Sequence, residues 1–333
     1  MRDSKANATR RSRAAARWGA WLLTPVFAMS LFFSFAAMPV ATAATQATDK
    51  AVWGIFSESR GGNNGQAVVN QLQSRIGRDF TGQRIYVSMD ASFPDPADTI
   101  VADQGGVIYH NFNSWHVNAA GQKVCYSWAD IAAGKYNTLL ATMANQVQAF
   151  LGRYPSETIY MSFTHEPTNG SAHHPRCGTA SQFIAAYDRV VQVFKTQGVT
   201  EPRVLWTWTS VASVFNGRQG GPTAWQPHTY DVVGVDGYNH SPGWRTPSQI
   251  FGNAEAFAVA HHKAILIGEI GVDEVAGHPA AKGQWYTAVS AMFRGWTNLD
   301  AIMWTNTNNG GDYWVDSSAQ SLAAFEAASK NFS

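Results

Sequence analysis

Two glutamates stand where apolar segments of the chain give way to polar loops. The segment 158–166, TIYMSFTHE, is apolar and rich in β-branched and aromatic residues until it ends on His165 and Glu166. The segment 264–271, AILIGEIG, carries Glu269 near the end of a second apolar run. Burying a carboxylate is costly unless it is paired or used. Two facing carboxyl groups, one protonated and one ionised, are what the hydrolysis of a glycosidic bond requires.

Eight short apolar segments indicate the elements that position these glutamates. Between most of them lie longer segments whose apolar residues recur at helical spacing. Strands that are apolar nearly throughout and alternate with helices are typical of a parallel sheet covered by helices. We therefore predict a single-domain α/β fold, the (β/α)8 TIM barrel; the alternative is an open doubly wound sheet, although no G-x-G-x-x-G follows the first strand. The predicted strands are 52–56, 85–90, 106–112, 158–166, 203–209, 231–239, 264–271 and 301–306, and the clearest helices are 137–151, 179–197, 247–262, 280–296 and 318–330.

In such a barrel the active site lies at the mouth, the end formed by the carboxyl ends of the strands. The fourth and seventh strands lie on opposite sides of the barrel, so Glu166 and Glu269 can face each other across the mouth. Further polar and aromatic residues occur late in the predicted strands, and we expect them to gather there. They are Asp90, His110, His165, Trp208, Asp236, Tyr238, Trp304 and Asn306.

These segments resemble the retaining (β/α)8 glycoside hydrolases with catalytic glutamates on strands four and seven. Within that clan the chain is most similar to glycoside hydrolase family 26, best known for endo-β-mannanases. The similarity rests on FTHEPTNG, IGEIG and VDGYN. It implies that Glu166 is the general acid/base and Glu269 the nucleophile of a retaining double displacement. It also implies substrate-site roles for Tyr238, which would hydrogen-bond the nucleophile, for His110 near the cleaved sugar and for Trp304 as its floor; His165, Asp236 and Trp115 are further candidates for contacts with the sugar.

The sequence departs from typical mannanases of this family after His165-Glu166. It continues PTNGSAHHPRCG, without the expected cluster of tryptophan and phenylalanine. We therefore expect a secreted endo-β-glycanase acting first on β-1,4-mannan, with xylan or mixed-linkage glucan as the alternative substrates. A carbohydrate-binding barrel without activity is a second class of function, which the presence of both glutamates disfavours.

A third class of function is a metal-dependent hydrolase that uses Asp90, His110 and Asp236. No metal or other cofactor is expected, however. The pairs His173-His174 and His261-His262 resemble metal ligands, but adjacent histidines point in different directions, and the second pair ends a predicted helix, where histidine is favoured by the helix dipole.

Residues 1–43 have the order of regions typical of a secretory signal peptide. A basic stretch precedes an apolar one, and ATA at 41–43 fits a signal peptidase site. Because the apolar region is long, an uncleaved membrane anchor is the alternative. Cleavage would leave a catalytic domain at 44–333 with 18 basic and 22 acidic residues, which does not favour nucleic acid or an anionic membrane as a partner. We expect an extracellular monomer whose partner is a polysaccharide or oligosaccharide.

Cys125 and Cys177 are the two cysteines of the chain. An exported protein with two cysteines usually pairs them. They fall in the loops after the third and fourth predicted strands, which are neighbours at the same end of the barrel, so the close approach that a disulfide needs is plausible. We predict a disulfide between them; the alternative is two unrelated buried thiols.

Overall fold

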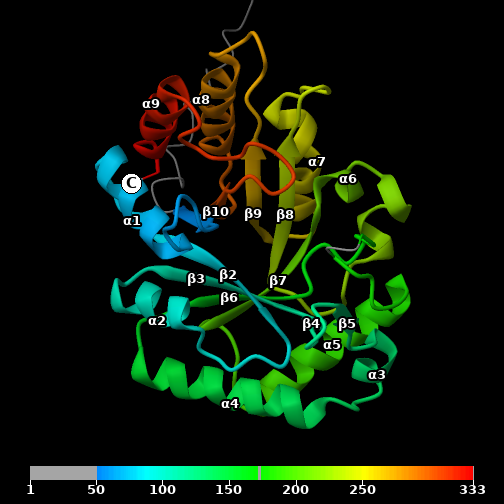
Figure 1. Ribbon diagram of the computed structural model, residues 1–333. Helices are drawn as coiled ribbons and strands as arrows, with labels where there is room; N and C mark the ends of the chain where they lie inside the picture. The colour runs from blue at the N-terminus through cyan, green and yellow to red at the C-terminus, as the bar shows by residue number, and fades with distance from the viewer. Residues whose placement is uncertain (1–50, 172–173, 333) are drawn as a thin grey trace, which may run out of the picture. The chain divides into compact units, whose positions relative to one another are not determined.

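Eight parallel strands form a closed barrel in the computed structural model, which describes residues 51–171 and 174–332 (Figure 1). The strands follow the order β1-β10-β9-β8-β7-β6-β3-β2 around the barrel. All eight correspond to the strands predicted from the sequence, so the (β/α)8 prediction is confirmed. The predicted signal peptide lies outside the described residues. The barrel strands are β1 (Val52–Ser57), β2 (Gly82–Ser88), β3 (Val107–Asn113), β6 (Ile159–Phe163), β7 (Val204–Val211), β8 (Val232–Asn239), β9 (Ala264–Val272) and β10 (Leu299–Asn306).

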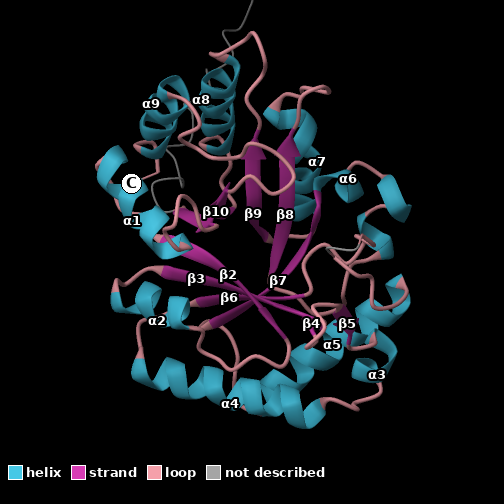
Figure 2. Cartoon of the chain, viewed as in Figure 1, coloured by secondary structure: helices cyan, strands magenta, loops and turns pink. Residues whose placement is uncertain are grey.

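Helices surround the barrel (Figure 2), and several of them begin at a residue whose side chain caps the first turn. At α5 and α7 a threonine caps the first turn while a glutamine three residues on bonds back, which satisfies backbone groups that a helix end leaves unpaired. No helix of the described residues is long and apolar enough to cross a membrane. The helices are α1 (Gly65–Ile76), α2 (Pro96–Asp103), α3 (Trp128–Ala132), α4 (Asn137–Arg153), α5 (Ala180–Thr196), α6 (Ala212–Phe215), α7 (Pro247–Ala260), α8 (Ala281–Phe293) and α9 (Ala319–Ser329), with 3₁₀ turns at Arg218–Gly220 and Pro222–Ala224.

The buried apolar side chains form two groups, one outside the barrel wall and one inside it. A large group lies between the strands and the helices. A small group fills the barrel interior, with six buried residues from five different strands. Side chains alternate between the two faces of a strand, and this alternation decides which polar residues reach the mouth. The interior residues are Tyr109, Tyr160, Val232, Leu266, Ala301 and Met303.

A hairpin and a disulfide build the loops on one side of the mouth. The strands β4 (Trp115–Val117) and β5 (Lys123–Cys125) pair in antiparallel fashion directly after β3. Cys125 at the end of β5 is bonded to Cys177, with a Cα–Cα distance of 5.4 Å, which confirms the predicted disulfide. The bridge joins the hairpin to the loop that follows Glu166.

Candidate active site

Glu269 points into the barrel because β9 changes its alternation just before it. Leu266 faces the interior, so strict alternation would turn Glu269 outward. The pairing of β9 with both neighbours shifts register after Ile267, as it does at a β-bulge. Gly268 lies at the shift, where a Cβ atom would clash with Asp236 Oδ1. A residue without a side chain therefore permits the bulge that aims Glu269 at the mouth.

Four side chains surround the Glu269 carboxylate. The Tyr238 hydroxyl donates a hydrogen bond to Oε2, and the Tyr86 hydroxyl donates one to Oε1 at 2.6 Å. Arg84 Nη1 lies 3.3 Å and His165 Nε2 lies 3.5 Å from Oε1. These contacts fix the orientation of the carboxylate and stabilise its negative charge, as attack on an anomeric carbon requires.

Beneath Glu269 lies a buried ion pair between Arg84 and Asp236. Nη1 of Arg84 donates to Oδ1 of Asp236 at 2.8 Å, and both side chains are fully buried. Burial raises the pKa of Asp236 to about 7, against the opposing effect of Arg84. Asp236 was predicted to contact the substrate; it instead holds Arg84 against Glu269, because its position on β8 lies deeper in the barrel than the mouth.

Glu166 emerges from a turn rather than from a strand. The strand β6 ends at Phe163, three residues earlier than predicted, and Thr164 and Glu166 have φ angles of 50° and 52°. This left-handed conformation is uncommon for residues other than glycine and clusters at functional sites. Backbone hydrogen bonds hold it, from Glu166 N–H to the Thr209 carbonyl at 3.2 Å and from His165 N–H to Asn111 Oδ1 at 3.1 Å.

The surroundings of Glu166 favour a protonated carboxyl group. Burial and then the negative charges of Glu269 and Asp236 raise its pKa well above the ordinary value, and a hydrogen bond from Asn169 Nδ2 opposes this at 3.3 Å. Burial and the Arg84 charge lower the pKa of the neighbouring His165. The mouth therefore holds one carboxyl group suited to donate a proton and one carboxylate stabilised by hydrogen bonds.

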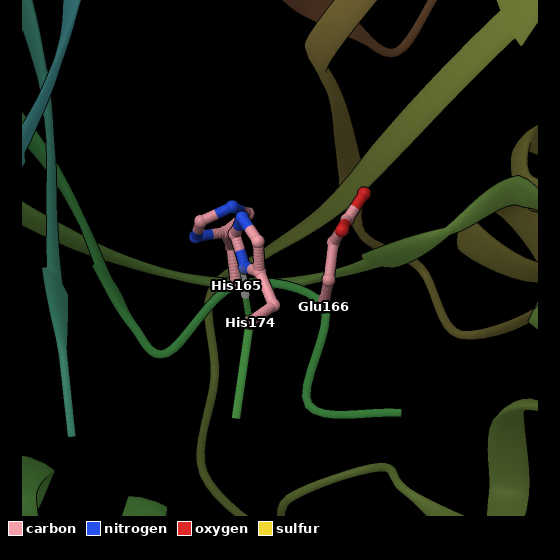
Figure 3. Close-up of side chains that lie close together, drawn as sticks. All are labelled: His165, Glu166 and His174. Atoms are coloured by element: carbon pink, nitrogen blue, oxygen red, sulfur yellow. The ribbon is translucent and has the colours of Figure 1, made fainter. Parts of the chain in front are cut away.

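A cavity of about 400 Å³ opens over Glu269. The predicted site residues Trp115, His165 and Tyr238 line it, together with Phe56 from β1 and His174. His165 and His174 line the cavity, and Glu166 lies close to both of them (Figure 3). The structure thus brings together five of the predicted residues, namely Glu166, Glu269, His165, Tyr238 and Trp115.

His110 does not reach the mouth. Tyr109 and Asn111 of β3 point into the barrel, so His110 points outward between them. There its Nδ1 lies 3.1 Å from Asp98 on α2, and its ring packs against Phe93. The expectation that His110 contacts the sugar is wrong, because it is one position out of phase with the inward face.

Trp304 also faces outward, against the helices. Met303 before it belongs to the barrel interior, and the Trp304 indole packs on Trp53, Tyr286 and Phe325 with only 1% of the residue exposed. The structure therefore corrects its predicted role as the floor of the sugar site. Trp208 is fully buried in the same outer layer, against Phe215, Tyr230 and Phe257.

The set proposed for a metal-dependent hydrolase does not assemble. Asp90 accepts a hydrogen bond from Ser88 at an exposed position, His110 faces α2, and Asp236 pairs with Arg84 inside the barrel. These three groups belong to three separate environments, and no shared ion could contact all of them.

Sequence reasoning missed three residues that contact or approach the two glutamates. Arg84 and Tyr86 alternate with apolar residues in β2 and contact Glu269. An arginine within a strand of a closed barrel could have indicated a buried ion pair near the mouth. His174 lies in the loop after Glu166, with its ring centroid 4.8 Å from that of His165. Nothing in the sequence around His174 indicates that it returns to the mouth.

Comparisons with known proteins support the fold. No model of a protein family matches the sequence. A curated relative, endoglucanase H of Acetivibrio thermocellus, is 26% identical over 283 residues, which are 79% of this chain and 29% of the relative. The chain thus spans less than a third of that protein's length.

Solved structures of mannanases share the barrel. The catalytic domain of the Bacillus sp. JAMB-750 family 26 endo-β-1,4-mannanase is 17% identical with a TM-score of 0.61, over 85% of this chain and 86% of that chain. The barrel has the fold of glycoside hydrolase family 26. The modular Cellulomonas fimi endo-β-1,4-mannanase of family 26 is also 17% identical, with a TM-score of 0.60. The match covers 85% of this chain and 71% of that chain. A third structure is a β-mannanase from a symbiotic protist of the termite Reticulitermes speratus, complexed with gluco-manno-oligosaccharide. It is 14% identical with a TM-score of 0.56, and the match covers 86% of this chain and 91% of that chain. The resemblance to family 26 drawn from three short motifs is therefore confirmed.

Proposed function

We propose that the protein is a secreted retaining endo-β-glycanase that hydrolyses β-1,4-mannan or a related β-glycan. The observation that carries the proposal is the contrast between the two carboxyl groups at one mouth. Glu269 is held by two tyrosine hydroxyls and Arg84, whereas burial and negative neighbours keep Glu166 protonated to a higher pH than an ordinary glutamate. A nucleophile and a general acid need this difference.

In the proposed reaction Glu269 attacks the anomeric carbon while Glu166 donates its proton to the leaving oxygen. The bond from carbon to the leaving oxygen breaks as the bond to Glu269 forms, which leaves a covalent glycosyl-enzyme. Glu166, now ionised, then takes a proton from water, and the water oxygen displaces Glu269. Both steps invert the anomeric carbon, so the product retains the starting configuration. Retaining enzymes place their two carboxyl groups roughly 5–5.5 Å apart, and we expect that separation here when substrate is bound.

Mannan is the first substrate to test because the solved relatives are named mannanases and one of them holds a gluco-manno-oligosaccharide. The name of the curated relative, an endoglucanase, supports a β-glucan as the alternative. The cavity suits a sugar, since it combines the aromatic faces of Phe56, Trp115 and Tyr238 with polar groups of Glu58 and Asn309.

Secretion is part of the proposal and rests on residues 1–43. We expect expression of the full chain in a secreting host to release a protein that begins near Ala44. N-terminal sequencing of the released protein would locate the cleavage site, and a full-length chain retained in the membrane fraction would instead support an anchor.

The test is a screen of the purified protein on mannan, galactomannan, xylan and mixed-linkage glucan, with Glu269→Gln as the matched control. We expect new reducing ends from at least one polymer with the wild type and nearly none with the variant. Proton NMR of the first product should show the β-anomer. Equal activity of the two proteins would refute the nucleophile, and an initial α-anomer would refute retention.

A further inference from the structure

We propose that His165, Glu166 and His174 form a zinc site at the edge of the mouth. Each offers one ligand atom, and the three atoms lie within 4.8 Å of one another. Figure 3 shows the two imidazole rings beside each other with the Glu166 carboxylate next to them. Two imidazoles and one carboxylate are a typical ligand set for zinc, whereas calcium and magnesium prefer oxygen ligands.

A second observation concerns the ring of His165. Its Nε2 faces Glu269 at 3.5 Å, and its Nδ1 is buried with no hydrogen-bond partner among the residues that the structure describes. The residue is only 3% exposed. A buried polar atom without a partner is uncommon and often marks the place of an ion or a water. A metal bound between His165 and His174 would give this nitrogen a partner.

The distances require only a small closure around the ion. Nitrogen and oxygen ligands lie about 2.0–2.2 Å from zinc in a tetrahedral arrangement, so two of them are roughly 3.3–3.6 Å apart. Because the three ligand atoms lie within 4.8 Å of one another, any pair of them must approach by at most about 1.5 Å. His174 can supply this movement because it lies in a loop rather than in a strand. The pair His173-His174 was not expected from the sequence to bind a metal, and His173 lies outside the described residues; in the structure the ring of His174 lies beside that of His165.

Electrostatics favour this set over the other group of ligands at the mouth. His165, Asp236 and Glu269 also lie within 4.8 Å of one another. Arg84 is 2.8 Å from Asp236 and 3.3 Å from Glu269, so its positive charge opposes a cation there. The Arg84 charge also acts on His165 and Glu166, but among the described residues Arg84 makes its ion pairs with Asp236 and Glu269 and makes none with Glu166.

Zinc at this site would inhibit hydrolysis, a consequence that rests on the proposed function. A metal bound to Glu166 occupies the oxygen that must carry a proton to the leaving group. It also fills the space beside His165, where the cavity meets Glu269. The protein would therefore respond to free zinc by a reversible loss of activity.

The test is titration calorimetry of metal-free protein with zinc chloride, in the absence of substrate. We expect one zinc per chain in the wild type. His174→Ala and Glu166→Gln should bind at least roughly tenfold more weakly, since even an outer partner of a ligand is worth 10- to 100-fold in affinity. His278→Ala, which removes an exposed histidine elsewhere, should bind as the wild type does. Circular dichroism should show that all variants are folded.

Two outcomes would overturn the site: no binding by the wild type, or equal affinity in His174→Ala and the wild type. Activity assays then separate this proposal from the proposed function. Zinc binding that depends on His174, in a protein that hydrolyses no glycan, keeps the site and removes the function. Hydrolysis without zinc binding keeps the function and removes the site. Hydrolysis with binding should be inhibited at the zinc concentrations that saturate the calorimetric site and restored by chelator.

Discussion

Glu166 and Glu269 are the same residue type, and their neighbours make them chemically different. Two tyrosines and Arg84 contact the Glu269 carboxylate, whereas the carboxyl group of Glu166 accepts one hydrogen bond, from the Asn169 side chain, among the described residues. The negative charge of Glu269 is itself one of the causes that raise the pKa of Glu166. The two proposed roles are therefore coupled, and a change at one glutamate should be measurable at the other.

The coupling predicts how activity depends on pH. A general acid works while it is protonated, so kcat/KM falls as the pH rises through its pKa. Because the pKa of Glu166 is raised, we expect this fall to lie above the ordinary carboxyl range. Glu269→Gln removes one negative charge and should lower the pKa of Glu166, as measured by carbon NMR titration. Glu326→Gln on α9 is the control and should leave that pKa unchanged; an unaltered pKa in Glu269→Gln would contradict the coupling.

Tyr86 is predicted to support the nucleophile as strongly as Tyr238 does. A hydrogen bond to a charged group is worth about 1.5–3 kcal/mol, so Tyr86→Phe should reduce kcat/KM roughly 10- to 150-fold. Tyr286→Phe is a matched control, because the Tyr286 hydroxyl is buried in α8 with no partner among the described residues. Steady-state kinetics would check both variants, and a Tyr86→Phe enzyme with wild-type kcat/KM would show that the bond is dispensable.

At the scale of single residues, sequence reasoning succeeded where a short motif or a strand end carried the signal. Glu166, Glu269 and Tyr238 meet because their strands end at one mouth. His110 and Trp304 failed because a strand position alone does not tell which face a side chain occupies, and one step along a strand reverses that face. Arg84 was missed because its role depends on Asp236, which lies 152 positions away in the sequence.

Among the elements, β9 matters most because its bulge determines the direction of Glu269. The register shift after Ile267 could not be foreseen from the apolar run, which reads as a regular strand. Of the two glycines in IGEIG, Gly268 is the one that the bulge requires, since a side chain there would meet Asp236 and Arg84.

Gly268→Ala is therefore predicted to affect both stability and catalysis. Its Cβ would clash with Asp236 Oδ1 and lie 2.7 Å from Arg84 Nη1. Overpacking of this kind costs about 1–3 kcal/mol, and a displacement of the nucleophile by about 1 Å can cost roughly 100-fold in rate. Gly152→Ala on α4 is the control, because no atom lies near its added methyl group. Urea unfolding and kcat/KM would be measured for both, and equal behaviour of the two variants would argue against the bulge.

At the scale of the whole molecule, the barrel was predictable because its strands are buried on both faces. Such strands appear in the sequence as apolar runs, and the helices between them have a different periodicity. The hairpin β4–β5 was not predicted. Each of its strands has three residues, and Val117 and Val124 are exposed, so it lacks the burial that marks a strand. The Cys125–Cys177 bridge ties it to the loop that follows Glu166.

The disulfide is predicted to stabilise the folded chain and to order one side of the mouth without determining the fold. It joins residues 52 positions apart, and in the chain-entropy model a loop of this size contributes up to about 4 kcal/mol. For a domain of this size about 1 kcal/mol changes Tm by roughly 2–4 °C, so Cys125→Ser with Cys177→Ser should lower Tm by about 15 °C at most. The closed barrel does not depend on the bridge, so the far-ultraviolet circular dichroism below Tm should stay unchanged.

The catalytic effect of losing the bridge should differ from its effect on stability. Cys177 lies in the loop that also carries His174 to the cavity, and the bridge ties this loop to the hairpin that carries Trp115. Loosening both walls should raise KM more than it lowers kcat, because Glu166 and Glu269 are held by strands and turns that the bridge does not touch. Wild type in reductant, measured after its thiols are shown to be free, is the matched control and should behave like the double variant. An unchanged KM, or a loss confined to kcat, would show that these loops do not form part of the substrate site.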